Sequence, residues 1–142
     1  MSPSDLPVGL LVSRTAKALS RAFDEALTAA GGSTATWLVL SALQAGPHRT
    51  QGELAETVGV RQPTLIHHLD GMERAGFVTR NRAPGNRRVQ RVQPTEAGEA
   101  LFLRLRRAAG SFDGRLRAGL DDAEVAELRR LLAQLTENAQ PD

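Results

Sequence analysis

Apolar residues recur at helical spacing along most of the chain, which predicts a mainly α-helical protein. The first pattern predicts a long helix over residues 6–30, ended by a pair of glycines. The second predicts a helix over residues 34–44, which a Gly-Pro pair follows. Because the first helix is apolar over more than one narrow stripe, we expect it to pack against partners on more than one side.

Two shorter helices are expected next, with a tight turn between them. Thr50 opens the first, and Glu53 three residues later is expected to complete a capping box. The turn lies at residues 58–60, and the following helix begins near Gln62 and ends at Gly76 in a left-handed cap. Two helices at this spacing are typical of a helix-turn-helix, whose second helix enters the major groove of DNA.

The period of the pattern then changes from helical to about two, which predicts two strands over residues 77–80 and 88–93. Residues 83–86, Ala-Pro-Gly-Asn, have the chemistry of the turn that joins them. A hairpin directly after a helix-turn-helix predicts a winged helix, in which the hairpin reaches the DNA backbone or the adjacent minor groove.

The distribution of charge supports this interpretation more than the overall balance does. The pI is about 10.3 although the formal net charge is only +2, because the basic residues other than Lys17 are arginines, which stay charged. Six arginines and no acidic residue lie between Arg74 and Arg91, whereas residues 118–142 hold six acidic residues and two arginines. Since the basic block coincides with the predicted hairpin, we interpret it as a surface for phosphates rather than a solvated face.

Composition and motifs exclude several other classes. With 41% hydrophobic and 24% charged residues the chain is globular, and the absence of cysteine excludes disulfides and thiol redox sensing. No nucleophile–base pair and no phosphate-binding loop is found, so neither an enzyme nor a cofactor is predicted. His67 and His68 are helix neighbours that point about 100° apart, and His48 has no ligand partners, so no metal site is predicted. Without a long apolar run or a signal peptide, we expect a cytoplasmic protein without membrane contact.

A set of short motifs lies between the shorter helices and the end of the hairpin. The motifs are Gln51-Gly52-Glu53-Leu54-Ala55, Val58-Gly59-Val60, Pro63-Thr64, Leu69-Asp70, Met72-Glu73-Arg74-Ala75-Gly76-Phe77-Val78, Asn86-Arg87-Arg88 and Thr95-Glu96-Ala97-Gly98. As a set they resemble the MarR family of bacterial regulators, and the outer helices extend the resemblance over nearly the whole chain. Asn86 stands where the family usually has aspartate, and Pro94 where it usually has leucine; asparagine can cap the turn but cannot pair with a wing arginine.

The resemblance implies a DNA interface formed by the recognition helix and the wing. Arg87 and Arg88 would lie at the wing tip, one entering the minor groove and the other bracing the loop. Arg80, Arg82 and Arg91 would flank them in the hairpin. His68 has two interpretations, a DNA contact or a partly buried helix residue. The recognition helix would present Arg61, Gln62, Thr64, His67 and His68 to the DNA.

The outer helices carry more apolar positions than one chain of this length can cover. Thr95 caps an expected helix over residues 96–117, and Asp121 with Glu124 opens a last helix, whose apolar stripe is Leu128, Leu131, Leu132 and Leu135. We therefore expect a homodimer: a single MarR-like domain, 1–142, with a DNA-binding lobe over 34–93 and dimerisation helices over 6–30 and 96–139.

The resemblance also implies a small aromatic or phenolic effector, bound between the dimerisation helices and the lobe, with Arg14 and Trp37 lining the cleft. The expected function is that of a repressor that binds a near-palindromic operator in double-stranded DNA and is released by the effector. Two alternatives stay open. A sequence-neutral architectural protein would show no preference for a palindrome, and a winged helix that binds only proteins would show no salt-dependent DNA binding.

Overall fold

The computed structural model describes residues 2–46 and 50–141, with the backbone alone described at residues 3, 83 and 86–88. His48, which the sequence analysis left without partners, lies outside the described residues. The chain divides into two compact units, Met1–Ala109 and Gly110–Asp142, and the boundary falls inside a helix. The whole of the predicted DNA-binding lobe lies in the first unit.

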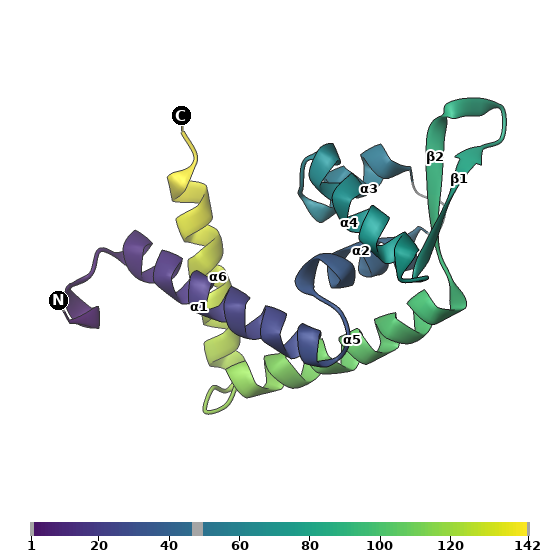
Figure 1. The fold of residues 1–142 in the computed structure, drawn as a ribbon. Helices are drawn as coiled ribbons and strands as arrows, with labels where there is room; N and C mark the ends of the chain where they lie inside the picture. The colour runs from purple at the N-terminus through teal and green to yellow at the C-terminus, as the bar shows by residue number, and fades with distance from the viewer. Residues whose placement is uncertain (1, 47–49, 142) are drawn as a thin grey trace. The chain divides into compact units, whose positions relative to one another are not determined.

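The structure is mainly helical with one two-stranded antiparallel sheet, which confirms the predicted fold class (Figure 1). Every predicted helix is present with bounds within about two residues of those expected, while both strands are longer than expected. The elements are the 3₁₀ turn η1 (Pro3–Asp5), α1 (Val8–Ala29), α2 (Thr34–Ala45), α3 (Gln51–Val58), α4 (Gln62–Arg74), β1 (Val78–Ala83), β2 (Asn86–Pro94), α5 (Glu96–Leu116) and α6 (Asp122–Ala139).

Helix α4 ends in a cap that turns the chain directly into the first strand. The N–H of Gly76 donates to the carbonyl of Glu73 at 3.0 Å, and the N–H of Phe77 donates to the carbonyl of Met72 at 2.9 Å. Gly76 has a φ of +82°, a conformation that residues with a Cβ rarely adopt. The predicted left-handed cap is therefore confirmed, and only residues 75–77 connect α4 to β1.

One core holds the first unit together. Leucine side chains from α2, α3, α4 and α5 have no exposed surface, and valines from both strands join them. The buried residues of this core are Leu27, Val39, Leu40, Ala42, Leu43, Leu54, Ala55, Leu65, Leu69, Met72, Val78, Val92, Leu101 and Leu105. Because α4 and the base of the hairpin share this core, their relative position is set by packing.

The start of α5 lies directly against the junction between α4 and β1. The backbone N–H of Thr95 donates to the carbonyl of Phe77 at 3.0 Å, and its hydroxyl donates to the carbonyl of Gly76 at 2.5 Å. The same hydroxyl accepts the N–H of Gly98 at 3.0 Å, which caps the helix as the sequence predicts. A Cβ on Gly98 would lie 2.0 Å from the Phe77 carbonyl oxygen, so only glycine permits this approach.

The outer helices contrast with this core. In α1, Leu27 is the one residue that is fully buried, and in α6 none is, among the residues that the structure describes. Helix α6 begins with the capping box expected at Asp121 and Glu124, with bonds of 2.7 Å and 3.0 Å. Of the box predicted at Thr50 and Glu53, the structure shows the bond in which the Glu53 N–H donates to the Thr50 hydroxyl, at 3.2 Å.

No single helix in the described part of the chain is long and apolar enough to cross a membrane. Helices α1 and α2 reach that length and apolarity only as a pair, which is bent by 75° at the break between them.

Candidate nucleic-acid interface

Helix α4 is anchored by one face and exposed on the other. Leu65, Leu69 and Met72 fix it to the core. The turn before it is tight because Gly59 has a φ of +81° and the N–H groups of Gly59 and Val60 both donate to the carbonyl of Ala55. This is the geometry of a helix-turn-helix. The predicted contact residues Arg61, Gln62, Thr64 and His67 are all exposed.

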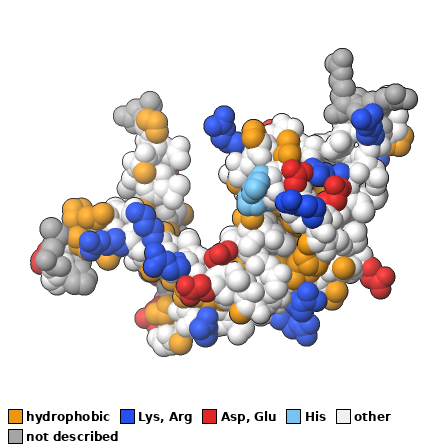
Figure 2. All heavy atoms as spheres, viewed as in Figure 1, with side chains coloured by type: hydrophobic (Ala, Val, Ile, Leu, Met, Phe, Trp, Pro, Cys, Tyr) orange, Lys and Arg blue, Asp and Glu red, His pale blue; other side chains and the backbone are white. Residues whose placement is uncertain are grey.

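The two histidines of α4 have different surroundings. His67 is exposed, whereas His68 is half-buried, and their ring centroids are 5.9 Å apart. Both border a hollow of about 330 Å³ between α4 and the α1–α2 turn, where Ser33 and Thr36 also lie. Figure 2 shows the histidine side chains on the surface of this lobe, with basic and acidic side chains close to them. Either predicted interpretation of His68 remains compatible with its half-buried position.

The hairpin is fixed at its base and extends away from the core toward its turn. Val78 and Val92, near its base, are almost fully buried, whereas Arg82 near the turn is exposed. The pairing shifts register between Arg82 and Ala83, and Gly85 forms the turn with a φ of +78°. Arg87 and Arg88 lie at the start of β2, and their side chains are outside the described part of the structure.

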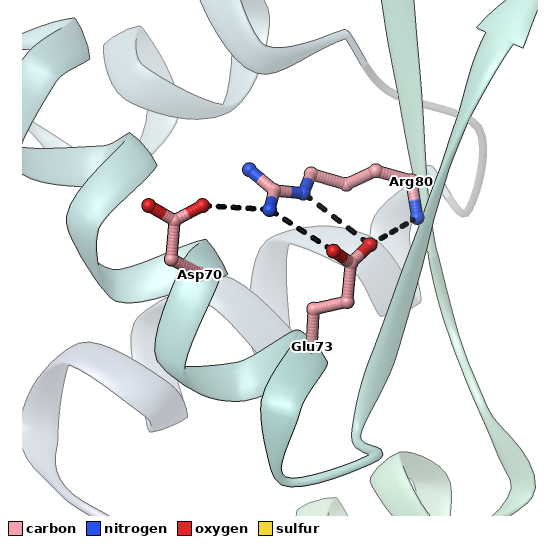
Figure 3. A network of polar contacts seen from close by, with 3 residues as sticks. All are labelled: Asp70, Glu73 and Arg80. Atoms are coloured by element: carbon pink, nitrogen blue, oxygen red, sulfur yellow. Dashed lines mark hydrogen bonds and ion pairs between the residues drawn. The ribbon is translucent and has the colours of Figure 1, made fainter.

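Arg80 contacts two carboxylates of α4 (Figure 3). Its Nη2 donates to Oδ1 of Asp70 at 2.6 Å and to Oε1 of Glu73 at 3.1 Å. Its Nε and its backbone N–H both donate to Oε2 of Glu73, at 3.4 Å and 3.2 Å. The side chain of Arg80 is only 15% exposed, so its charge faces α4.

The electrostatics of this contact favour the charged form of each partner. The hydrogen bond from the Arg80 side chain, more than the charge alone, lowers the pKa of Glu73 below its ordinary value. The same bond to Glu73 and the bond to Asp70 raise the pKa of Arg80. Strand β1 and helix α4 are therefore joined by several hydrogen bonds between one guanidinium and two carboxylates.

Sequence reasoning treated Arg80 as one of the wing arginines available for DNA. The structure instead gives its guanidinium two carboxylate partners, which the sequence analysis did not assign to any role. Asp70 and Glu73 stand three residues apart on one face of α4, and they directly precede the acid-free block that begins at Arg74. That spacing, followed by a strand, was the signal that could have found them.

The opposite side of the hairpin contacts α3. Arg91 in β2 forms an isolated antiparallel bridge with Thr50, the residue that caps α3. Arg80 and Arg91 belong to adjacent strands, with Arg80 opposite Val92 and Arg91 opposite Asn81. The base of the wing is thus tied to both helices of the helix-turn-helix.

The two residues predicted to line an effector cleft, Arg14 and Trp37, share no polar or ring contact in the described part of the chain. Trp37 stacks on Phe102 of α5, with ring centroids 5.4 Å apart and an interplanar angle of 9°. Arg14 is exposed on α1, and within the described part of the chain no hydrogen bond, ion pair or ring contact joins it to Trp37. Neither residue borders the hollow beside His68.

The geometry of α3, the turn, α4 and the hairpin defines the class of protein as a winged helix-turn-helix. A sequence model of the MarR family matches residues 31–89, the stretch from the turn after α1 into β2. The structure is also similar, over nine-tenths or more of its length, to solved members of that family.

Three of these structures are close in fold and about a quarter identical in sequence. The transcriptional repressor CouR, bound to a 23-mer DNA duplex, is 28% identical with a TM-score of 0.83, covering 94% of each chain. A cysteine-to-serine mutant of MarR from E. coli, complexed with operator DNA, is 26% identical with a TM-score of 0.81, covering 92% of this chain and 94% of that one. A MarR-family regulator from Rhodococcus sp. is 26% identical with a TM-score of 0.77, covering 90% and 91%.

Through the family model over residues 31–89 and the fold of the solved structures, the chain is similar to the MarR family of winged-helix transcriptional regulators.

Proposed function

We propose that this protein is a transcriptional repressor that binds a near-palindromic duplex as a homodimer and leaves it when a small molecule binds. The observation that carries the proposal is the exposed face of α4 beside a basic hairpin whose base is fixed to the same core. Its support from relatives is that CouR and MarR were solved on DNA duplexes, and CouR is described as a repressor.

In this proposal the exposed face of α4 reads bases and the wing contacts phosphates or the minor groove. Arg61, at the N-terminal end of α4, makes no capping bond with its side chain and is free to reach the backbone. Arg82, Arg87 and Arg88 supply the wing contacts. The base-reading residues are Gln62, Thr64 and His67, with His68 at the edge of the set.

Dimerisation is supported by apolar surface that one chain leaves exposed. Leu128, Leu131, Leu132 and Leu135 of α6 are between 37% and 47% exposed, and Val8 and Leu10 of α1 are 58% and 47% exposed. Stripes of this kind usually mark a helix interface. A two-fold dimer through the outer helices would set two copies of α4 in successive major grooves, about 34–36 Å apart.

Release by an effector is proposed through a change in the spacing of the two lobes. A ligand shifts the equilibrium only if it binds one spacing better than the other. Trp37 and Phe102 offer a stacked aromatic wall next to α2 and α5, which suits an aromatic or phenolic compound, and Arg14 offers a cation for an acidic group.

The test begins with selection of bound sequences from a random duplex pool, with and without candidate phenolic ligands. Recovery of a palindrome supports the repressor, whereas binding without any sequence preference supports the architectural alternative. If the protein shows no salt-dependent binding to DNA, the result supports the third alternative, a winged helix that binds only proteins.

The contact residues are then tested on the selected duplex. Arg87→Ala and Arg88→Ala should weaken binding and lower the salt slope by about 2 per dimer. His67→Ala should relax the preference at one base pair, at a cost of about 1–3 kcal/mol. The matched control is Arg129→Ala, which removes an arginine from the polar side of α6. Equal affinity of all four variants and the parent would contradict the assigned surface.

A further inference from the structure

We infer that Arg80 acts as a positioning residue: it orients the wing on α4 and neutralises two carboxylates that face the DNA, without itself touching the duplex. This inference rests on the proposed function, because it assigns a role within DNA binding. It differs from the sequence-based expectation, in which Arg80 was one more arginine for phosphate.

The positive charge of Arg80 is paired with the carboxylates of α4. Three donor nitrogens, Nη2, Nε and the backbone N–H, are used on Asp70 and Glu73. Both oxygens of the Glu73 carboxylate are engaged, one by Nη2 and the other by Nε and the backbone N–H (Figure 3). The guanidinium holds Glu73 through both Nε and Nη2 while Nη2 also reaches Asp70, and a lysine ammonium, with its single nitrogen, cannot supply both sets of bonds.

The two carboxylates lie on the exposed side of α4, near residues proposed to contact DNA. The side chains of Asp70 and Glu73 are 49% and 42% exposed, and with His67 and Arg74 they border a hollow on the exposed side of α4. His67 is one of the residues proposed to contact DNA. Two unpaired carboxylates so close to the phosphate backbone would repel it. Arg80 therefore serves binding by cancelling a repulsion.

The position of Arg80 in the hairpin allows it to set the angle between the wing tip and α4. Its strand partner, Val92, is fully buried and fixes the base, and the bridge between Thr50 and Arg91 holds the other strand to α3. Arg80 is the contact from β1 to the exposed side of α4. If that contact is lost, the base stays packed while the tip, with Arg87 and Arg88, is free to change its angle to α4.

Arg80→Lys separates positioning from direct contact with phosphate. A lysine keeps the charge, so a direct phosphate contact would survive, but its single nitrogen cannot replace the bonds from both Nη2 and Nε. We expect Arg80→Lys to lower affinity for the selected duplex by about tenfold, within the range of coupled pairs, with no change in salt slope. Arg82→Ala, at a proposed direct contact, should instead lower the slope by about 1 per subunit. Arg129→Lys, on α6, is the matched control and should bind like the parent.

A mutant cycle tests whether Arg80 acts through its partners. Arg80→Ala should weaken binding strongly in the parent but only slightly in the Asp70→Asn/Glu73→Gln background, because there no carboxylate is left to neutralise. Thermal unfolding of each variant shows whether the fold is retained.

The outcomes separate this inference from the proposed function. The inference is overturned if Arg80→Lys binds like the parent, or if Arg80→Ala costs the same in both backgrounds and lowers the salt slope by about 1 per subunit. Hydrogen exchange of the free protein gives a readout that needs no DNA: Arg80→Lys should speed exchange at the Arg80 amide and in the hairpin. If the parent binds no duplex, the proposed function fails, while unchanged exchange in Arg80→Lys removes the positioning role by itself.

Discussion

Leu40, Leu54 and Leu65 in the DNA-binding lobe have no exposed surface, whereas Leu128, Leu131 and Leu132 in α6 are between 41% and 47% exposed. All of these leucines belong to apolar patterns at helical spacing in the sequence, the first three in α2, α3 and α4 and the others in α6. The lobe closes its core within one chain because helices α2 to α5 and two strands meet there. Helix α6 buries no residue among those that the structure describes, which is consistent with the proposed dimer.

The difference shows that apolar periodicity predicts a helix with an apolar face, but it does not predict which element packs against that face. Within the lobe, stability is expected to depend on single close contacts and to be independent of protein concentration. In the outer helices it is expected to depend on assembly and so on concentration. Substitutions in the two regions should therefore have different signatures.

The largest effect is expected at the junction of α5 with the α4–β1 turn. Gly98→Ala would place a Cβ 2.0 Å from the Phe77 carbonyl oxygen, a backbone atom that cannot move alone. We expect a loss of about 3 kcal/mol or more in the free energy of unfolding, measured in urea at fixed protein concentration. Gly71→Ala in α4 is the control: nothing lies within 4 Å of the added carbon, so stability should be unchanged or raised by up to about 1 kcal/mol. Equal effects of the two would show that the junction is not tightly packed.

The next effect is expected in the leucine stripe of α6. Leu131→Glu combined with Leu132→Glu should convert the dimer into a monomer of 15.3 kDa at micromolar concentration, seen by sedimentation. DNA affinity should fall by about 100-fold or more, because two half-sites are no longer bound together. Ala133→Glu adds a charge to the opposite, exposed face of α6 and should leave the dimer intact. A parent protein that is already monomeric while it binds a palindrome tightly would remove the contrast between the two regions.

A smaller effect is expected from pH, and it is confined to the lobe. Because Arg80 lowers the pKa of Glu73 in the folded state, the pair stabilises the fold above the ordinary glutamate value of about 4.3. This contribution is lost as the pH falls through the lower, folded-state pKa. The effect is small because the Glu73 side chain is 42% exposed. Unfolding midpoints between about pH 6 and pH 3 should fall more for the parent than for Glu73→Gln, and parallel curves would argue against the pair.

The smallest effect is expected from oxidation. The chain has no cysteine, and of its two methionines Met72 is 5% exposed in the core. Brief treatment with peroxide should therefore leave DNA binding unchanged, as measured by titration with the selected duplex. A rapid loss that a thiol reductant reverses would contradict this expectation, since it requires a thiol.

The sequence alone determined the order and approximate bounds of the helices and strands, the tight turn before α4 and the left-handed cap at Gly76. These depend on neighbours within a few residues, namely helical period, caps and glycine, so the local pattern contains the information. Its motifs also indicated the resemblance to the MarR family, whose sequence model matches residues 31–89. The wing was predicted from the change of period, although both strands proved longer.

Only the tertiary structure decided what the side chains within those elements contact. Arg80 looked like its neighbours in a basic block, but it lies seven and ten residues beyond the two carboxylates that hold it. In the sequence, Gly98 was one residue of a motif with no assigned contact. In the structure, the carbonyl of Phe77, 21 residues earlier, occupies the space that a Cβ at position 98 would need. The physical reason is the same in both cases. Contacts between elements depend on how those elements pack in three dimensions, and a local pattern of apolar and charged residues does not contain that packing.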